Sequence, residues 1–214
     1  MDEIIRGDLL KDHVYKRISD MIVNAELMPG DRITESSIAD KFGVSLTPVR
    51  EALIKLHADG VINKIPHKGF YVKQYSEQEI RDIYEVFMAL QILAIEIAVK
   101  KFTEEDILEQ SKLVDEMEAS CDLGDFKNYL AANRKVHDYY INRSENQYLI
   151  DTYQSICILP IPIFYFAEKD KEVKSMRKGI KEHRGLIKCF RNKDMSGVRK
   201  IMAAHYGVED YLIQ

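Results

Sequence analysis

The fold of the first part of this chain is decided by residues 43–53, Gly43-Val44-Ser45-Leu46-Thr47-Pro48-Val49-Arg50-Glu51-Ala52-Leu53. Gly43 is a typical helix terminator, because glycine adopts a left-handed backbone without strain. Thr47 and Pro48 are typical of a helix start, where threonine caps free N–H groups and proline loses no helical bond. The apolar residues that follow are spaced for one helix face: Val49, Ala52, Leu53 and Leu56. The stretch therefore predicts a helix end, a tight turn and a new helix that begins at Thr47-Pro48.

Two more helices are predicted upstream of this turn. Within residues 9–25, apolar residues recur at steps of three and four, which indicates an amphipathic helix. A turn at Pro29-Gly30 ends that segment. A short second helix then starts at Thr34, with Ile33 and Ile38 placed to pack together as a hydrophobic staple. Three helices with a tight turn between the last two are typical of a helix-turn-helix.

A hairpin is predicted directly after the third helix. Residues 61–65 and 70–73 have the composition of two short strands, and Pro66-His67-Lys68-Gly69 forms the tip between them. A two-stranded hairpin in this place is the wing of a winged helix-turn-helix. The first domain is therefore predicted to span residues 1–74.

The rest of the chain, residues 75–214, is predicted to be an all-helical bundle. Ser76 and Glu79 form a capping box that opens a long helix to about Lys100. Thr103 caps the next helix. Further helices are predicted over residues 125–143, 146–168, 175–191 and 194–212. Alternating patterns are absent here, so the whole protein is predicted to be mainly α, with a winged helix-turn-helix followed by a helical sensor domain.

Composition and charge favour a folded cytoplasmic protein with a DNA partner. Hydrophobic residues make up 46% of the chain and charged residues 31%, which excludes a disordered chain. No apolar run is long enough to span a membrane, and three widely spaced cysteines are expected to be reduced thiols. The net charge is −4, but residues 41–75 hold six Lys and Arg against two Asp and Glu. Such a basic segment predicts a DNA-contacting surface of limited size.

Candidate DNA contacts gather on the outward face of the third helix and at the wing tip. Arg50 can bind guanine with two hydrogen bonds or clamp a phosphate. Ser45 and Thr47 can donate to phosphate oxygens at the positive end of the helix dipole. The full set from this part of the chain is Ser45, Leu46, Thr47, Arg50, Lys55, His67, Lys68 and Gly69. Each residue alone could be a cap or a solvated side chain, but their order favours DNA binding.

This part of the chain resembles the DNA-binding domain of GntR-family regulators. The resemblance covers residues 9–73 and rests on four segments: Pro29-Gly30-Asp31-Arg32-Ile33-Thr34-Glu35, Ile38-Ala39, residues 43–53 and Gly60-Val61-Ile62. It implies that Ser45, Thr47, Arg50 and the wing contact operator DNA. The chain departs from the family at Leu46 and at Ser36, two DNA-facing positions where arginine is usual or common. A different preferred operator is therefore expected, in which Leu46 can touch a thymine methyl group.

Four polar residues of the second domain are candidate metal ligands. Asn133 and His137 are four residues apart and so lie on one face of a helix. His183 and His205 lie in the last two predicted helices. Three imidazoles and an amide oxygen can bind a divalent transition metal inside a bundle. Their spacing alone is weak evidence for a metal site, because a lone buried histidine is more often a hydrogen-bonded core residue.

Residues 76–210 resemble the FCD effector domain of the FadR subgroup. In metal-binding members an acidic or amide residue precedes a histidine by four positions, and Glu-His and a final histidine follow. Asn133, His137, Glu182-His183 and His205 match this pattern. The resemblance implies a divalent metal, zinc, nickel or manganese, and a small effector, often a carboxylate, that completes its coordination.

An effector pocket is expected beside these residues. Its candidates are Phe87, Gln91, Tyr140, Phe164 and Tyr165. In the FadR subgroup that this part of the chain resembles, arginine and glutamate are often found at the positions of Phe87 and Gln91, so a more apolar pocket is expected here. Any one of the aromatic residues could also be ordinary core.

The sequence therefore predicts a homodimeric regulator, a repressor rather than an activator, that binds a palindromic DNA operator under the control of a small metabolite. Two alternatives use the same histidines: a metal-dependent hydrolase and a direct metal sensor. The hydrolase is disfavoured because the chain has no His-Glu-x-x-His helix, serine elbow or phosphate loop.

Overall fold

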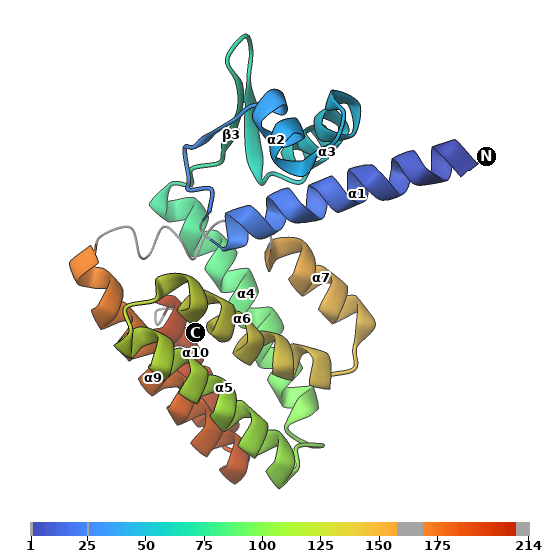
Figure 1. Ribbon diagram of the computed structural model, residues 1–214. Coiled ribbons are helices and arrows are strands. Elements are labelled where there is room, and N and C mark those ends of the chain that lie inside the picture. Colours follow the sequence, from blue (N-terminus) through green and yellow to red (C-terminus); the bar gives the residue numbers. More distant parts are fainter. Residues whose placement is uncertain (1, 25, 158–168, 209–214) are drawn as a thin grey trace. The chain divides into compact units, whose positions relative to one another are not determined.

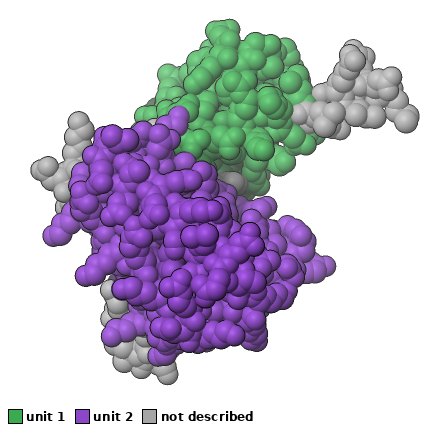
Figure 2. All heavy atoms as spheres, turned by 60° about the horizontal axis from the view of Figure 1, so that its bottom comes forward, with its two compact units in different colours: residues 1–74, 157–164 green, residues 75–156, 165–214 purple. Residues whose placement is uncertain are grey.

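The computed structural model describes residues 2–24, 26–157 and 169–208 (Figure 1). The chain divides into two compact units, coloured separately in Figure 2. Residues 1–74 and 157–164 form the first, here called the N-terminal unit, and residues 75–156 and 165–214 form the second, the C-terminal unit. None of the described helices is long and apolar enough to cross a membrane.

The N-terminal unit is built on three helices, α1 (Asp2–Val23), α2 (Glu35–Phe42) and α3 (Leu46–Ala58). Thr34 caps α2 by accepting a hydrogen bond from the N–H of Ser37 at 3.2 Å, and Gly43 ends it with a φ of 67°. One apolar cluster holds the three helices together, and its buried members include Ile18, Ile22, Ile33, Ile38, Leu53, Leu56, Ile62 and Phe70. The predicted helix-turn-helix is confirmed.

Two helix starts differ from the predicted ones. α1 begins at Asp2 rather than near residue 9, because the apolar pattern that predicted it could not mark the turns before Leu10. α3 begins at Leu46 with Ser45 as its N-cap, so the prediction that Thr47 caps this helix is wrong. Pro48 is the third helical residue, where its missing N–H still has no partner within the helix.

The wing is part of a three-stranded antiparallel sheet in the order β1-β3-β2. The predicted hairpin is present as β2 (Ile62–Ile65) and β3 (Gly69–Val72). The prediction of only two strands was incomplete, because β1 (Arg32–Ile33) pairs with the other edge of β3. Two residues are too few to show an alternating pattern, so β1 left no signal in the sequence.

The C-terminal unit is all-helical, as predicted. Its described helices are α4 (Glu77–Ala98), α5 (Glu104–Asp122), α6 (Phe126–Arg143), α7 (Gln147–Cys157), α9 (Lys169–Asn192) and α10 (Met195–Tyr206). Ser76 and Thr103 form the predicted N-caps of α4 and α5. α9 begins six residues before its predicted start, and α10 ends at Tyr206 with Gly207 as its C-cap, earlier than the predicted end at residue 212. The part of the predicted helix 146–168 beyond Cys157 lies outside the described residues.

Five of these helices pack in a closed ring. α4 contacts α6, α6 contacts α5, α5 contacts α9, α9 contacts α10, and α10 returns to α4 (Figure 1). The interior is apolar, with Met88, Ile95, Met117, Ile141, Leu186 and Met202 almost fully buried. Polar side chains that point inward from α4, α6, α9 and α10 are therefore gathered in one enclosed place.

Candidate functional site

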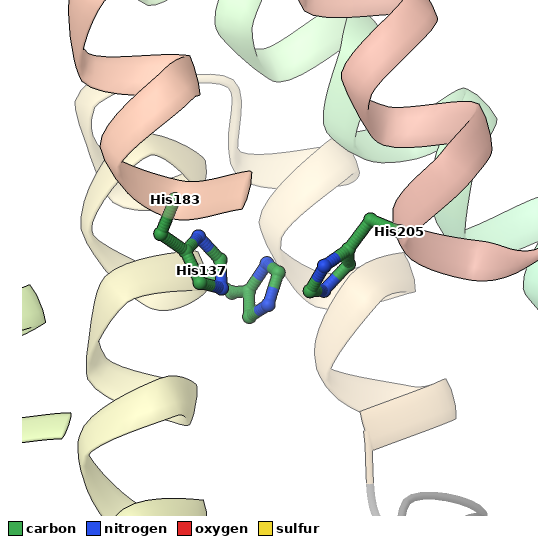
Figure 3. A group of neighbouring side chains, drawn as sticks. All are labelled: His137, His183 and His205. Atoms are coloured by element: carbon green, nitrogen blue, oxygen red, sulfur yellow. The ribbon is translucent and has the colours of Figure 1, made fainter. Parts of the chain in front are cut away.

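Three histidines from three helices of the C-terminal unit lie together (Figure 3). His137 is on α6, His183 on α9 and His205 on α10. Each offers a ligand atom, and these atoms lie within 4.8 Å of one another. The ring centroids are 4.8 Å apart for His137 and His183, 5.3 Å for His137 and His205, and 4.9 Å for His183 and His205. The fold thus brings together the three histidines singled out in the sequence.

Burial keeps two of these imidazoles neutral. His137 is 5% exposed and His183 is 1% exposed. Removal from water lowers the pKa of each well below its usual value of 6.5, and the neighbouring histidines lower it further. A neutral imidazole has a lone pair for a metal ion, so His137 and His183 are in the protonation state that ligation needs.

A hydrogen-bond network from α4, α6 and α10 orients His137. Its Nδ1–H donates to Oε1 of Gln91 at 2.7 Å. The same oxygen accepts from the hydroxyl of Tyr140, and Nε2 of Gln91 donates to the hydroxyl of Tyr206. Because Nδ1 carries the proton, Nε2 of His137 keeps the lone pair that can bind an ion.

A carboxylate orients His205 in the same way. Nδ1 of His205 donates to Oε2 of Glu182 at 2.8 Å. Glu182 also pairs with Lys178, one turn earlier on α9, at 3.5 Å. Hydrogen bonds of this kind fix the tautomer and ring angle of histidines that bind metals.

Asn133 contacts the third histidine. Its Oδ1 lies 3.0 Å from Nε2 of His183. The other ring nitrogen of His183, Nδ1, is buried and has no hydrogen-bond partner among the described residues. An unpartnered polar atom in an apolar interior costs free energy unless something binds it or the ring turns to meet a ligand. The Asn133–His183 pair is therefore the least satisfied part of the cluster.

The DNA-facing candidates lie on the exposed face of α3. Ser45, Leu46, Thr47 and Arg50 are all exposed, and Leu46 keeps 48% of its surface in contact with solvent. The side chain of Ser45 makes no capping hydrogen bond, although this residue occupies the N-cap position. The hydroxyl group is therefore not committed to the first turn of its own helix.

Arg50 is held by an acid from the preceding helix. Its Nε–H donates to both carboxylate oxygens of Glu35 at 3.1 Å, and Nη2–H donates to Oε2 at 2.7 Å. These hydrogen bonds hold the pKa of Glu35 below its usual range, and the positive charges of Arg50 and Lys64 lower it further. Glu35 thus stays ionised near neutral pH on the surface that carries the DNA candidates.

The remaining candidates outside the wing are exposed. Ser36 lies in the first turn of α2. Lys55 pairs with Asp12 of α1 at 3.2 Å and lies 4.6 Å from the ring centroid of Tyr15. An exposed pair of this kind is weak, so it does not prevent Lys55 from exchanging Asp12 for a phosphate.

The wing tip is a tight turn. The N–H of Lys68 donates to the carbonyl of Ile65 at 3.0 Å, with Pro66 and His67 between them. His67 has a φ of 61°, and proline followed by a residue of positive φ is the signature of a type II turn. His67 and Lys68 are both exposed. Gly69, the first residue of β3, has a φ of 100°, a backbone conformation that glycine adopts without strain.

Known protein families match both units. The gntR family of bacterial regulatory proteins matches residues 10–72, and the FCD domain matches residues 82–207, more than half of the chain. The chain belongs to the GntR family. The DNA-binding and effector domains that the sequence resembled are therefore confirmed.

Individual relatives agree with this assignment. The HTH-type transcriptional regulator YdhC of Bacillus subtilis is 25% identical, over 90% of this chain and 85% of its own. McbR of Escherichia coli is 24% identical, over 83% and 80%. Its solved structure covers 95% of this chain and 96% of its own with a TM-score of 0.81. The HTH-type transcriptional repressor RspR of Escherichia coli is 20% identical, over 92% and 85%.

GntR-family proteins are DNA-binding transcriptional regulators and not enzymes. The alternative of a metal-dependent hydrolase is therefore excluded. Regulators of this family bind DNA and small-molecule effectors, so both kinds of partner are assigned to this chain.

The residues of this GntR-family protein fit the metal ion that FCD domains often bind. Three imidazoles converge, two of them are oriented through Nδ1, and the third has a buried nitrogen that finds no hydrogen-bond partner in the described part of the chain. Nitrogen donors with one amide oxygen suit zinc, nickel or manganese. The chemistry and the burial of the cluster therefore agree with a metal centre.

The predicted effector-pocket residues fall into two groups. Gln91 and Tyr140 are fully buried, and their polar atoms belong to the network that orients His137. Phe87 is also buried, edge-on to Tyr153 and stacked on Tyr206. Phe164 and Tyr165 lie outside the described residues.

Two residues with clear contacts were missed from the sequence. Glu35 accepts hydrogen bonds from Arg50 although the two residues are fifteen positions apart. Tyr206, at the end of α10, accepts a hydrogen bond from Gln91 of α4. No local spacing links either pair, so neither contact could be found from periodicity. The only signal in the sequence for Tyr206 was its place directly after His205.

Proposed function

We propose that this chain is a homodimeric repressor that binds a palindromic operator and responds to a small carboxylate metabolite. The carboxylate would bind beside a divalent transition metal held by Asn133, His137, His183 and His205. The observation that carries the proposal is the convergence of three histidines from three helices in the unit that does not contain the helix-turn-helix.

The charge of the candidate ligands supports an anionic effector. All four are neutral when they bind an ion: three imidazoles and one amide. The ion would supply a Lewis-acid centre with its positive charge unbalanced by any ligand. A carboxylate oxygen is a favourable partner for such a centre, because a buried charge is stable only when it is paired.

The DNA side of the proposal rests on the geometry of the N-terminal unit. One winged helix covers one half-site, so a two-fold symmetric dimer reads a palindrome. Ser36, Ser45, Leu46, Thr47, Arg50 and Lys55, with His67, Lys68 and Gly69 of the wing, are the proposed contacts. RspR, which aligns with most of this chain, is named a repressor, and this supports the proposed sign of regulation.

Elemental analysis and DNA titration test the proposal together. Protein purified without chelator should carry close to one equivalent of zinc, nickel or manganese per chain, and His183→Ala should lose it. Adding carboxylate metabolites to the metal-loaded protein should weaken operator binding, measured by fluorescence anisotropy. Less than a tenth of an equivalent of metal, with no thermal shift on adding any of the three ions, would overturn it.

A direct metal sensor is the second candidate, favoured by the enclosure of the cluster. His137 and His183 expose almost no surface, as suits a site that accepts only an ion. Zinc, nickel or manganese alone should then change operator affinity, with no organic compound present. The same titration without metabolites separates the two candidates.

A further inference from the structure

The DNA-facing surface of the N-terminal unit contains an acid that phosphate attraction alone does not explain. Glu35 is the first residue of α2, and its side chain is 27% exposed where it meets Arg50. A carboxylate on a surface that approaches DNA repels phosphates and so lowers affinity for every sequence. The position of Glu35 indicates a role in discriminating between DNA sequences rather than in raising the affinity for DNA.

The carboxylate occupies one edge of the guanidinium and leaves another edge open. A guanidinium has five N–H donors in a rigid plane. Glu35 takes Nε–H and an N–H of Nη2. The edge that remains, formed by Nη1 and the second N–H of Nη2, is the pair that fits O6 and N7 of guanine. The side chain of Arg50 is 61% exposed, so this edge is accessible.

We infer that Glu35 is a positioning residue that holds Arg50 with its open edge toward a guanine of the operator. This inference rests on the proposed role of Arg50 in reading bases. A guanidinium that is already restrained loses less conformational freedom on binding than one that rotates freely. It also matches a planar partner in one orientation more closely. The negative charge of Glu35 also weakens binding to phosphates alone, which lowers affinity for unrelated sequences.

The position of Glu35 is supported from two sides of the surface. Thr34 anchors the start of α2 through its cap, so the backbone of Glu35 is fixed. Lys64 of the wing adds a positive charge that helps to keep the carboxylate ionised. Residues of α2 and of the wing therefore both contribute to holding the side chain of Arg50 on α3 in place.

The test is a comparison of base preferences. The full-length protein first selects its preferred duplex from a random pool, and every base pair of that duplex is then substituted in turn. Glu35→Gln should lower the preference for one guanine by roughly tenfold or more, while affinity for an unrelated duplex stays equal or rises. Glu51→Gln is the matched control, because it removes an acid from an exposed position of α3 next to Arg50. Its guanine preference should match that of the unaltered protein.

Each other outcome overturns the inference. An unchanged guanine preference in Glu35→Gln, or an equal rise in affinity for all sequences, would show that Glu35 only repels phosphates. If Glu35→Gln unfolds at a lower temperature than the unaltered protein, Glu35→Asp provides a second test. Aspartate keeps the negative charge but is too short to hold the guanidinium in the same way, so the guanine preference of this variant should still fall.

Arg50→Ala separates this inference from the proposed function. If Arg50→Ala changes no base preference, the role of Arg50 as a reader fails. If it removes a guanine preference that Glu35→Gln and Glu35→Asp retain, only the positioning role fails.

Discussion

Asn133 contributes an oxygen without a charge to the histidine cluster, at a position where the FCD pattern has an acidic or amide residue. Its Oδ1 lies 3.0 Å from Nε2 of His183, close enough for both to approach one ion. Ligand charge raises the affinity of an oxygen site for a divalent cation. The residue is therefore the place where a single substitution can strengthen the proposed metal site.

Asn133→Asp should bind zinc about tenfold more tightly, because it adds a negative charge beside the ion. Competition with a chromogenic chelator measures this. Asn142→Asp, which adds the same charge at an exposed position of α6, should leave the affinity unchanged. Equal affinities for the unaltered protein and Asn133→Asp would remove Asn133 from the ligand set.

The buried histidines should also make stability depend on pH. Burial lowers the pKa of His137 and His183 from 6.5, so between the lowered values and 6.5 the unfolded chain binds more protons than the folded protein. The free energy of unfolding of the metal-free protein should therefore be highest above about pH 6.5, and it should decrease as the pH falls toward the lowered pKa values.

Urea denaturation of chelator-treated protein at a series of pH values from about 5 to 7.5 checks this. His183→Gln should reduce the pH dependence, whereas His67→Ala, which removes an exposed histidine, should not. A free energy of unfolding that stays constant across the series would contradict the buried, neutral state of the cluster.

At the scale of elements, α3 carries an exposed leucine where a DNA contact is expected. Leu46 is the first residue of the helix and is 48% exposed. Leu46→Arg should shift the selected operator toward guanine at one position. It should also steepen the slope of log K for operator binding against log salt by about one. Ile54→Arg, at a 49% exposed position two turns later, is the matched control and should raise affinity without adding that guanine. Identical selected sequences for both variants would show that Leu46 does not face a base.

The start of α4 depends on a reciprocal cap. The hydroxyl of Ser76 accepts from the N–H of Glu79 at 3.3 Å, and the Glu79 carboxylate accepts from the N–H of Ser76 at 2.9 Å. Ser76→Ala should lower the free energy of unfolding by about 1 kcal/mol, because N–H groups of the first turn lose their partner. Ser76→Asp keeps an acceptor and should stay near the original value. Urea denaturation compares the two, and equal losses would mean that the cap is not what stabilises α4.

The elements differ in how well their sequence predicts them. The caps at Thr34, Ser76 and Thr103 were predictable because a cap is a contact between residues three positions apart. The N-cap of α3 was misplaced by two residues, at Thr47 instead of Ser45, because proline is tolerated at several first-turn positions. The strand β1 was missed because its partner lies about forty residues away and its own two residues have no pattern.

For the molecule as a whole, the distribution of charge matters more than its sum. The net charge is −4, yet residues 41–75 are strongly basic. Operator affinity should therefore fall steeply and linearly on a plot of log K against log salt. Lys68→Ala should reduce the slope by about one, whereas Lys100→Ala, in the C-terminal unit, should not change it. A flat plot would show that the basic segment does not contact phosphates.

The candidate site was predictable in its parts but not in its contacts. The four-residue spacing of Asn133 and His137 placed them on one helix face, His183 and His205 were candidates on the last two predicted helices, and the resemblance to FCD domains joined all four in one pattern. The orienting partners could not be predicted, because Gln91 and Tyr206 meet only when α4 and α10 pack together. Long-range packing of this kind leaves no periodic trace in a single sequence.

The pairing of β1 with β3 limits where this chain can gain or lose residues. Ile33 lies opposite Phe70, and the N–H of Val72 donates to the carbonyl of Asp31 at 2.9 Å. One inserted residue just before Ile33 would slip this register and turn a side chain that is 2% exposed out of the core. An insertion at Pro66-His67 would only enlarge a surface turn. Across related chains, we therefore expect differences in length at the wing tip and a constant length between Gly30 and Ile33.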